Sequence, residues 1–144
     1  MLARIRHAKM ELRPVRRNST SCVFTGECVE LVAHYAIDGA EEVGFELRDG
    51  AVRHRIAIDL RARTLSVLHE RVALPPGIDA RDLVLRAFID RSLVEVFVGA
   101  RISCTAVLRR RAGGGALEIL PLARGGSGTA RVECFTLADI GVDD

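Results

Sequence analysis

Apolar and polar residues alternate with a period of two along most of the chain, which is the pattern of half-buried β-strands. The alternation is strict from Val29 to Ile37, where Glu30 and His34 occupy the polar positions. We count about nine such segments, separated by turn-forming residues at regular spacing, and find no convincing helical period. The pattern predicts an all-β sandwich.

The most regular stretch runs from Leu85 to Leu108. Two of its strands are joined by Asp90-Arg91-Ser92, a sequence that suits a tight turn because Asp and Ser side chains can bond nearby backbone N–H groups. In the second strand Val94, Val96 and Val98 face one way, and Leu93, Glu95 and Phe97 face the other. Glu95 is a carboxylate in mid-strand, and we expect it to form a salt bridge with Arg86 on the neighbouring strand.

Turn signals separate the other strands. Asp49-Gly50 favours a type I′ hairpin, in which both central residues need positive φ. Leu74-Pro75-Pro76-Gly77 cannot belong to a central strand and is predicted to be a loop.

Composition narrows the class of protein. The 144 residues fit one domain with its own core, and a net charge of +2 is too small to argue for a nucleic-acid partner. The sequence has no apolar run near the ~20 residues that a membrane span needs, and its basic N-terminus lacks the hydrophobic centre of a secretory signal. We therefore expect a cytoplasmic protein that does not contact membranes.

The four cysteines show neither a CxxC pair nor histidines at the spacing of a zinc site. Cys104 and Cys134 fall at alternating strand positions, where free cysteine is commonly a small buried hydrophobe. A disulfide between Cys22 and Cys28 remains possible, although reduced thiols are the simpler expectation. The residues predict no metal or cofactor site.

The residues also predict no catalytic site. His54 has no partner at useful spacing and is expected to be a half-buried strand histidine. Asp90 and Glu95 are the obvious carboxylate pair for glycoside hydrolysis, but Asp90 has a sufficient role in the turn. With no Trp, one Tyr and five Phe, the chain has few rings to offer to a sugar, so a tight sugar site is not expected.

The segment from Phe88 to Val98 closely resembles the Asp-Arg-Ser…Glu-Val-Phe hairpin of the C-terminal β-sandwich of glycoside hydrolase family 32. That family includes invertases, sucrose-6-phosphate hydrolases, inulinases and levanases. A looser similarity covers most of the chain, for example Gly39 through Arg48. The resemblance marks five residues as structural parts of the family motif: Asp90, Arg91, Ser92, Glu95 and Phe97.

In that family, catalysis by a retaining mechanism belongs to an N-terminal five-bladed propeller. Its Trp-Met-Asn-Asp-Pro-Asn-like and Arg-Asp-Pro motifs do not occur here, and Glu27-Cys28, which matches the acid/base dipeptide, leads directly into a strand. The resemblance therefore implies a non-catalytic module that stabilises a catalytic propeller, in cis or in trans. The module would border the cleft or a dimer interface of a sucrose- or fructan-hydrolysing enzyme.

The resemblance also sets the expected organisation. Residues 1–20 would be a linker or an incoming strand from a propeller, residues 21–140 the sandwich and residues 141–144 a tail. The expected fold is a two-sheet antiparallel β-sandwich of the concanavalin or lectin-like jelly-roll type. One face should be unusually apolar because it lacks its partner. A homodimer and a weak carbohydrate contact are further possibilities, and the alternative is a free-standing lectin-like carbohydrate-binding or oligomerisation module.

Overall fold

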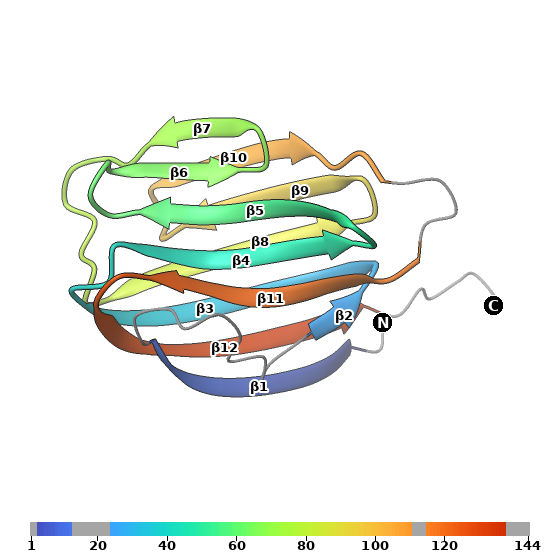
Figure 1. Cartoon of the computed structure of the whole chain (residues 1–144), viewed down its shortest axis with the longest axis horizontal. Coiled ribbons are helices and arrows are strands. Elements are labelled where there is room, and N and C mark those ends of the chain that lie inside the picture. The colour runs from blue at the N-terminus through green and yellow to red at the C-terminus, as the bar shows by residue number, and fades with distance from the viewer. Residues whose placement is uncertain (1–2, 13–23, 111–114, 138–144) are drawn as a thin grey trace.

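Two six-stranded antiparallel sheets packed face to face make up the protein, in a computed structural model that describes residues 3–12, 24–110 and 115–137 (Figure 1). Sheet A consists, in spatial order, of β1 (Ala3–Leu12), β12 (Ser127–Leu137), β3 (Cys28–Asp38), β8 (Leu83–Asp90), β9 (Leu93–Val98) and β10 (Ile102–Val107). Sheet B consists of β2 (Phe24–Gly26), β11 (Leu117–Arg124), β4 (Glu42–Asp49), β5 (Val52–Asp59), β6 (Thr64–Val67) and β7 (Glu70–Ala73). The prediction of an antiparallel β-sandwich is confirmed.

The described residues contain twelve strands, where the pattern predicted about nine. The short strands β2 and β7, of three and four residues, are too brief for alternation to be visible in the sequence. Residues 3–12 form β1, which pairs along its whole length with β12 and lies at one edge of sheet A. The expected tail at 141–144 lies outside the described residues.

The core is the layer between the sheets, and the alternation places it. On β3, the residues from Val29 to Ile37 that share the predicted apolar face are all buried. On β9, Val94, Val96 and Val98 are fully buried, so Glu95 and Phe97 point outward. The inward and outward positions predicted for β3 and β9 are therefore confirmed.

The hairpin between β4 and β5 differs from its predicted turn. Asp49 pairs with Val52, so the central residues are Gly50 and Ala51, and of these two only Gly50 has a positive φ, of 60°. Type I′ requires positive φ at both central residues, so the predicted turn type is wrong although the hairpin is correct.

A close backbone approach joins the start of β12 to the end of β3. Gly126 has a φ of +63°, and a Cβ built on it would lie 2.1 Å from the carbonyl carbon and oxygen of Gly39. Both the conformation and the space therefore demand glycine.

We expect Gly126→Ala to lower the free energy of unfolding by about 3 kcal/mol, because the methyl group would overlap backbone that cannot rotate away. Gly99→Ala is the matched control, since Gly99 has a similar φ of +58° but its nearest contact is the Arg101 Cγ at 3.9 Å. The control should lose only about 1 kcal/mol. Urea unfolding of both variants measures the difference, and equal losses would contradict the proposed overlap.

Candidate functional site

The outer surface of sheet A carries apolar side chains from three neighbouring strands. Phe88 and Phe97 meet edge to face, with ring centroids 6.0 Å apart and an interplanar angle of 90°. Leu93 and Val107 are direct cross-strand partners, and their exposed fractions of 46% and 55% are large for apolar residues. We call Val84, Phe88, Leu93, Phe97 and Val107 the aromatic face.

The hairpin motif predicted from the sequence forms one edge of the aromatic face. Arg91 and Ser92 make the two-residue turn, and Arg91 has a φ of 52°. Backbone bonds hold this turn from both sides, because the Arg91 N–H donates to the Glu27 carbonyl at 2.9 Å and the Leu108 N–H donates to the Ser92 carbonyl at 2.7 Å. The motif thus connects β8 and β9 to the chain before β3 and after β10.

The side chain of Asp90 also contacts the neighbouring strand β3. Its carboxylate Oδ1 accepts a hydrogen bond from the Cys28 thiol, with 3.4 Å between the two atoms, across the β3–β8 pair. Partial burial and, secondly, this bond to Asp90 raise the pKa of the Cys28 thiol. Cys28 is a free thiol, and Cys22, its candidate disulfide partner, lies outside the described residues.

The predicted salt bridge between Arg86 and Glu95 is wrong. Arg86 Nε lies 3.4 Å from Glu30 Oε2, so it pairs with β3 rather than with β9. Glu95 instead lies between Phe88 on one side and Thr105 on the other in the sheet register. The pattern places Arg86 and Glu95 on one face but does not choose between two carboxylates at diagonal positions.

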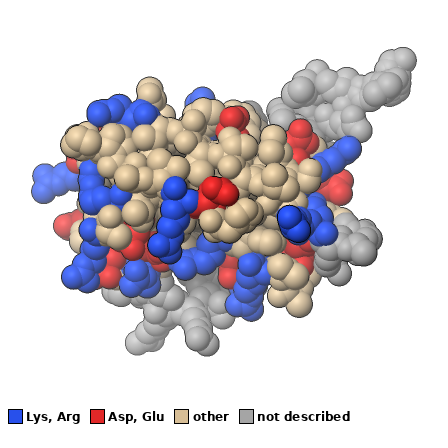
Figure 2. Space-filling view, turned by 90° about the horizontal axis from the view of Figure 1, so that it is seen from above, with Lys and Arg blue, Asp and Glu red and all other residues tan. Residues whose placement is uncertain are grey.

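The outer surface of sheet B carries many charged side chains, in contrast to the apolar cluster on the outer surface of sheet A. Figure 2 looks down on the edge formed by β6, β7 and β10, where uncharged side chains cover much of the middle and charged side chains are densest toward the lower side. The outward charges of β4, β5 and β11, which we call the charged face, comprise as many acidic as basic residues. They are Glu42, Glu46, Arg48, Arg53, Arg55, Asp59, Glu118 and Arg124.

Glu46 gathers two arginines at one end of the charged face. Its Oε2 accepts from Arg48 Nε at 2.9 Å, and its Oε1 lies 3.9 Å from Arg53 Nη1. Arg48 and Arg53 are direct cross-strand partners, a like-charge pair that is unfavourable by itself. The glutamate carboxylate compensates that repulsion, and its hydrogen bond with Arg48 orients the Arg48 guanidinium.

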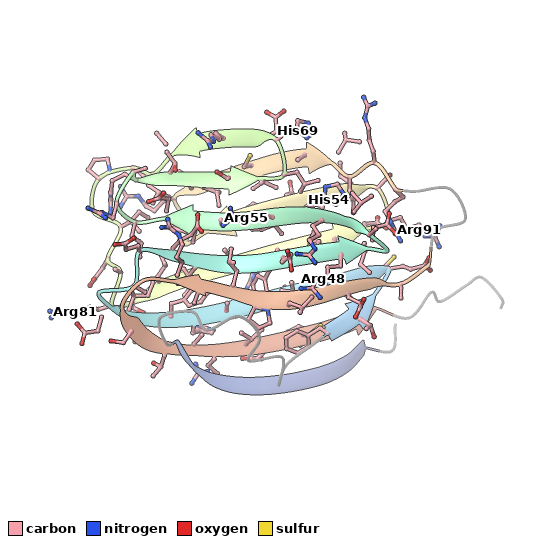
Figure 3. The ribbon with its side chains drawn as sticks, viewed as in Figure 1. Arg48, His54, Arg55, His69, Arg81 and Arg91 are labelled. Atoms are coloured by element: carbon pink, nitrogen blue, oxygen red, sulfur yellow. The ribbon has the colours of Figure 1, made fainter. Side chains whose placement is uncertain are left out.

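Arg55 connects the two ends of the charged face. Arg55, labelled in Figure 3, pairs with Glu46 in the register. Its Nη2 nevertheless donates to Glu42 Oε1, four register pairs further along the hairpin. Its side chain therefore crosses the Gly44–Ala57 pair, and both of these residues are buried. Gly44 is required there, because a Cβ would lie 1.9 Å from the Ile56 carbonyl oxygen.

Glu42 is consequently a carboxylate with only 11% of its side chain exposed and two cationic partners. Besides Arg55, it accepts from Arg124 Nε of β11 at 3.4 Å. This network was not predicted from the sequence. Its third strand is 82 residues away, and the sequence offers no signal for that pairing.

A buried ion pair closes the end of the sandwich beside His54. Asp49 Oδ2 lies 3.2 Å from Arg110 Nε, and their side chains are 2% and 14% exposed. His54 is half-buried, as predicted, and its Nε2 is buried without a hydrogen-bond partner in the described structure. Burial lowers the pKa of His54, Arg110 and His69 add to that effect, and Asp49 opposes it.

Within the described residues, no group of three or more His, Cys, Asp or Glu side chains is arranged to hold a metal ion. A search of the same residues for a helix long and apolar enough to cross a membrane found none.

The chain matches, over residues 2–136, the family described as glycosyl hydrolases family 32 C terminal. No curated protein matches it. Among solved structures, it resembles the exo-inulinase of Aspergillus awamori with a TM-score of 0.71 and 18% identity, over 93% of this chain and 29% of that one. It thus spans less than a third of that enzyme's length.

Two smaller sandwich proteins share the fold. A galectin from Caenorhabditis elegans superposes with a TM-score of 0.57 and 11% identity, over 88% of this chain and 94% of the galectin. A carbohydrate binding module from Bacillus subtilis gives 0.53 and 11% identity, over 78% and 74%. At these identities the likeness concerns the fold alone, and it agrees with the lectin-like sandwich predicted from the sequence.

The stability of the fold should depend on the titration of His54. The unfolded chain binds a proton near the ordinary histidine pKa of about 6.5, whereas the folded chain resists it, so stability falls as the pH drops below that value. We expect His54→Leu to flatten this dependence between about pH 7 and pH 5.5. Chemical denaturation at several pH values measures it, and an unchanged slope would show that His54 is not responsible.

Proposed function

The chain belongs to the C-terminal family of glycoside hydrolase family 32, and from this premise we propose that it is the non-catalytic sandwich of a sucrose- or fructan-hydrolysing enzyme. In this role it packs against a five-bladed catalytic propeller, in cis or in trans, and stabilises it. The module supplies surface and rigidity, and the propeller supplies the carboxylates of hydrolysis.

The observation that carries this proposal is the aromatic face. Monomeric soluble proteins seldom leave apolar clusters without a partner, and such a cluster supports a protein–protein contact. Leu93 and Val107 together with the Phe88–Phe97 pair supply apolar area at the centre of such a contact. Arg86 with Glu30, and Glu95, lie among these residues and supply polar contacts that set the orientation of the partner.

Contact with carbohydrate is the second candidate function. The charged face favours it, because fixed guanidinium and carboxylate groups alternate there on an open sheet. One of the proteins that share the fold is named a carbohydrate binding module, and this supports the second candidate. This second function does not compete with docking, since it uses the other sheet.

We expect Phe88→Ser and Phe97→Ser to weaken binding to the propeller at least about tenfold, because each removes buried aromatic area from the contact. Leu122→Ser is the matched control, a half-buried leucine on the outer surface of sheet B. The partner is a propeller with the family's catalytic motifs, sought in the neighbouring gene sequence and expressed separately, and sedimentation velocity measures the complex.

Three results would count against docking through this face. The first is that the neighbouring sequence encodes no propeller with the catalytic motifs. The second is that Phe88→Ser, Phe97→Ser and Leu122→Ser weaken binding equally, and the third is self-association of the chain through Phe88 and Phe97. The last result would assign the aromatic face to a homodimer instead.

The chain by itself should not release fructose from sucrose or from a short fructan, because Asp90 is bonded to Cys28 and Glu95 lies between Phe88 and Thr105. A sensitive assay of reducing sugar measures this. Activity of the isolated chain that Glu95→Gln abolishes would overturn the non-catalytic assignment.

A further inference from the structure

The charged face combines features that suit a ligand of a specific chemistry. Its acidic and basic residues are equal in number, and they are interleaved rather than separated. A polyanion such as phosphate or nucleic acid would meet Glu42 and Glu46 wherever it met an arginine. The electrostatics therefore favour an uncharged ligand that can both donate and accept hydrogen bonds.

The arginines keep donors available for such a ligand. A guanidinium group carries five N–H donors, and the described contacts of Arg55 and Arg53 with glutamates use one nitrogen of each. Their side chains are 52% and 65% exposed, so the remaining donors face solvent. Glu46, at 21% exposure, offers carboxylate lone pairs beside them.

Salt bridges restrict Glu46 and Arg55 before any ligand arrives, and Arg53 Nη1 lies 3.9 Å from the same Glu46. Arg48 is fixed on Glu46 at 2.9 Å, and Arg55 lies across the Gly44–Ala57 pair to reach Glu42. Ordering a long side chain on binding costs free energy, and here the ion pairs have already restricted it. A polar surface of preordered groups is better suited to binding than the flexible arginines of an ordinary surface.

Vicinal hydroxyl groups match this arrangement. Each sugar hydroxyl can accept a hydrogen bond from a guanidinium and donate one to the adjacent carboxylate. From the proposed role as a module of a sucrose- or fructan-hydrolysing enzyme, on which this step rests, the expected ligand is the enzyme's own class of substrate. We propose that Glu46, Arg53 and Arg55 form a binding site on sheet B for the vicinal hydroxyls of an uncharged saccharide, a fructan chain.

Backbone amide NMR of the full chain, titrated with sucrose and with a short inulin-type fructan, tests this site. We expect shifts confined to β4, β5 and β11, with Arg55→Gln weakening the apparent affinity about tenfold through the loss of a charge-assisted hydrogen bond. Arg131→Gln is the control, because Arg131 is also an exposed arginine in mid-strand but lies on β12 of sheet A, outside both proposed sites. It should titrate like the unchanged chain.

The outcomes separate this inference from the docking proposal. The proposed site is wrong if neither sugar produces shifts on the charged face. It is also wrong if Arg55→Gln lowers thermal stability but leaves the sugar titration unchanged. Shifts produced equally by inorganic phosphate would overturn the assignment to an uncharged ligand. Phe88→Ser should weaken docking while it leaves the sugar titration intact, so failure of docking and failure of the sugar site give different results.

Discussion

Burial of the inner face of each sheet against the other is the constraint on which the rest of the structure depends. Because side chains alternate, fixing Val94, Val96 and Val98 in the core also fixes Glu95 and Phe97 outside it. A slip of one residue would exchange the two sets, at the cost of the whole apolar face of the strand. The core therefore determines which residues lie on the outer surfaces, and the contacts of those outer side chains are not needed to fix the strand register.

What could be predicted from the sequence follows from this constraint. Alternation is a local property. The sandwich, the inward-facing residues of β3 and β9 and the half-buried state of His54 could therefore be predicted from the sequence. The partners of Arg86 and Asp90 could not, because each has several candidates on adjacent strands and the choice depends on side-chain paths. The turn at Gly50 likewise depends on the φ of Ala51, which the dipeptide Asp49-Gly50 does not determine.

The two outer surfaces differ in how far the sequence reveals them. The aromatic face is built largely from β8, β9 and β10, which follow one another in the chain, so the sequence pattern places its members together. The charged face needs β11 beside β4, a pairing that brings Arg124 to Glu42 across 82 residues. Cross-strand geometry between distant segments is set by the packing of the whole sandwich, and a single sequence carries little local signal for it.

In the proposed enzyme the outer surface of sheet A docks to the propeller, and the outer surface of sheet B contacts sugar. The two contacts can form together because they lie on different sheets. A few hydrogen bonds on an open sheet give a weak sugar site, because water competes for every donor and acceptor. Docking through the opposite sheet would tether that site to a catalytic propeller, so that a fructan chain long enough to pass around the sandwich would engage both domains. The second contact is then intramolecular, and its strength is set by effective concentration rather than by the intrinsic affinity of the charged face. If the charged face binds sugar and sheet A docks as proposed, a weak site on sheet B would therefore be sufficient for substrate retention.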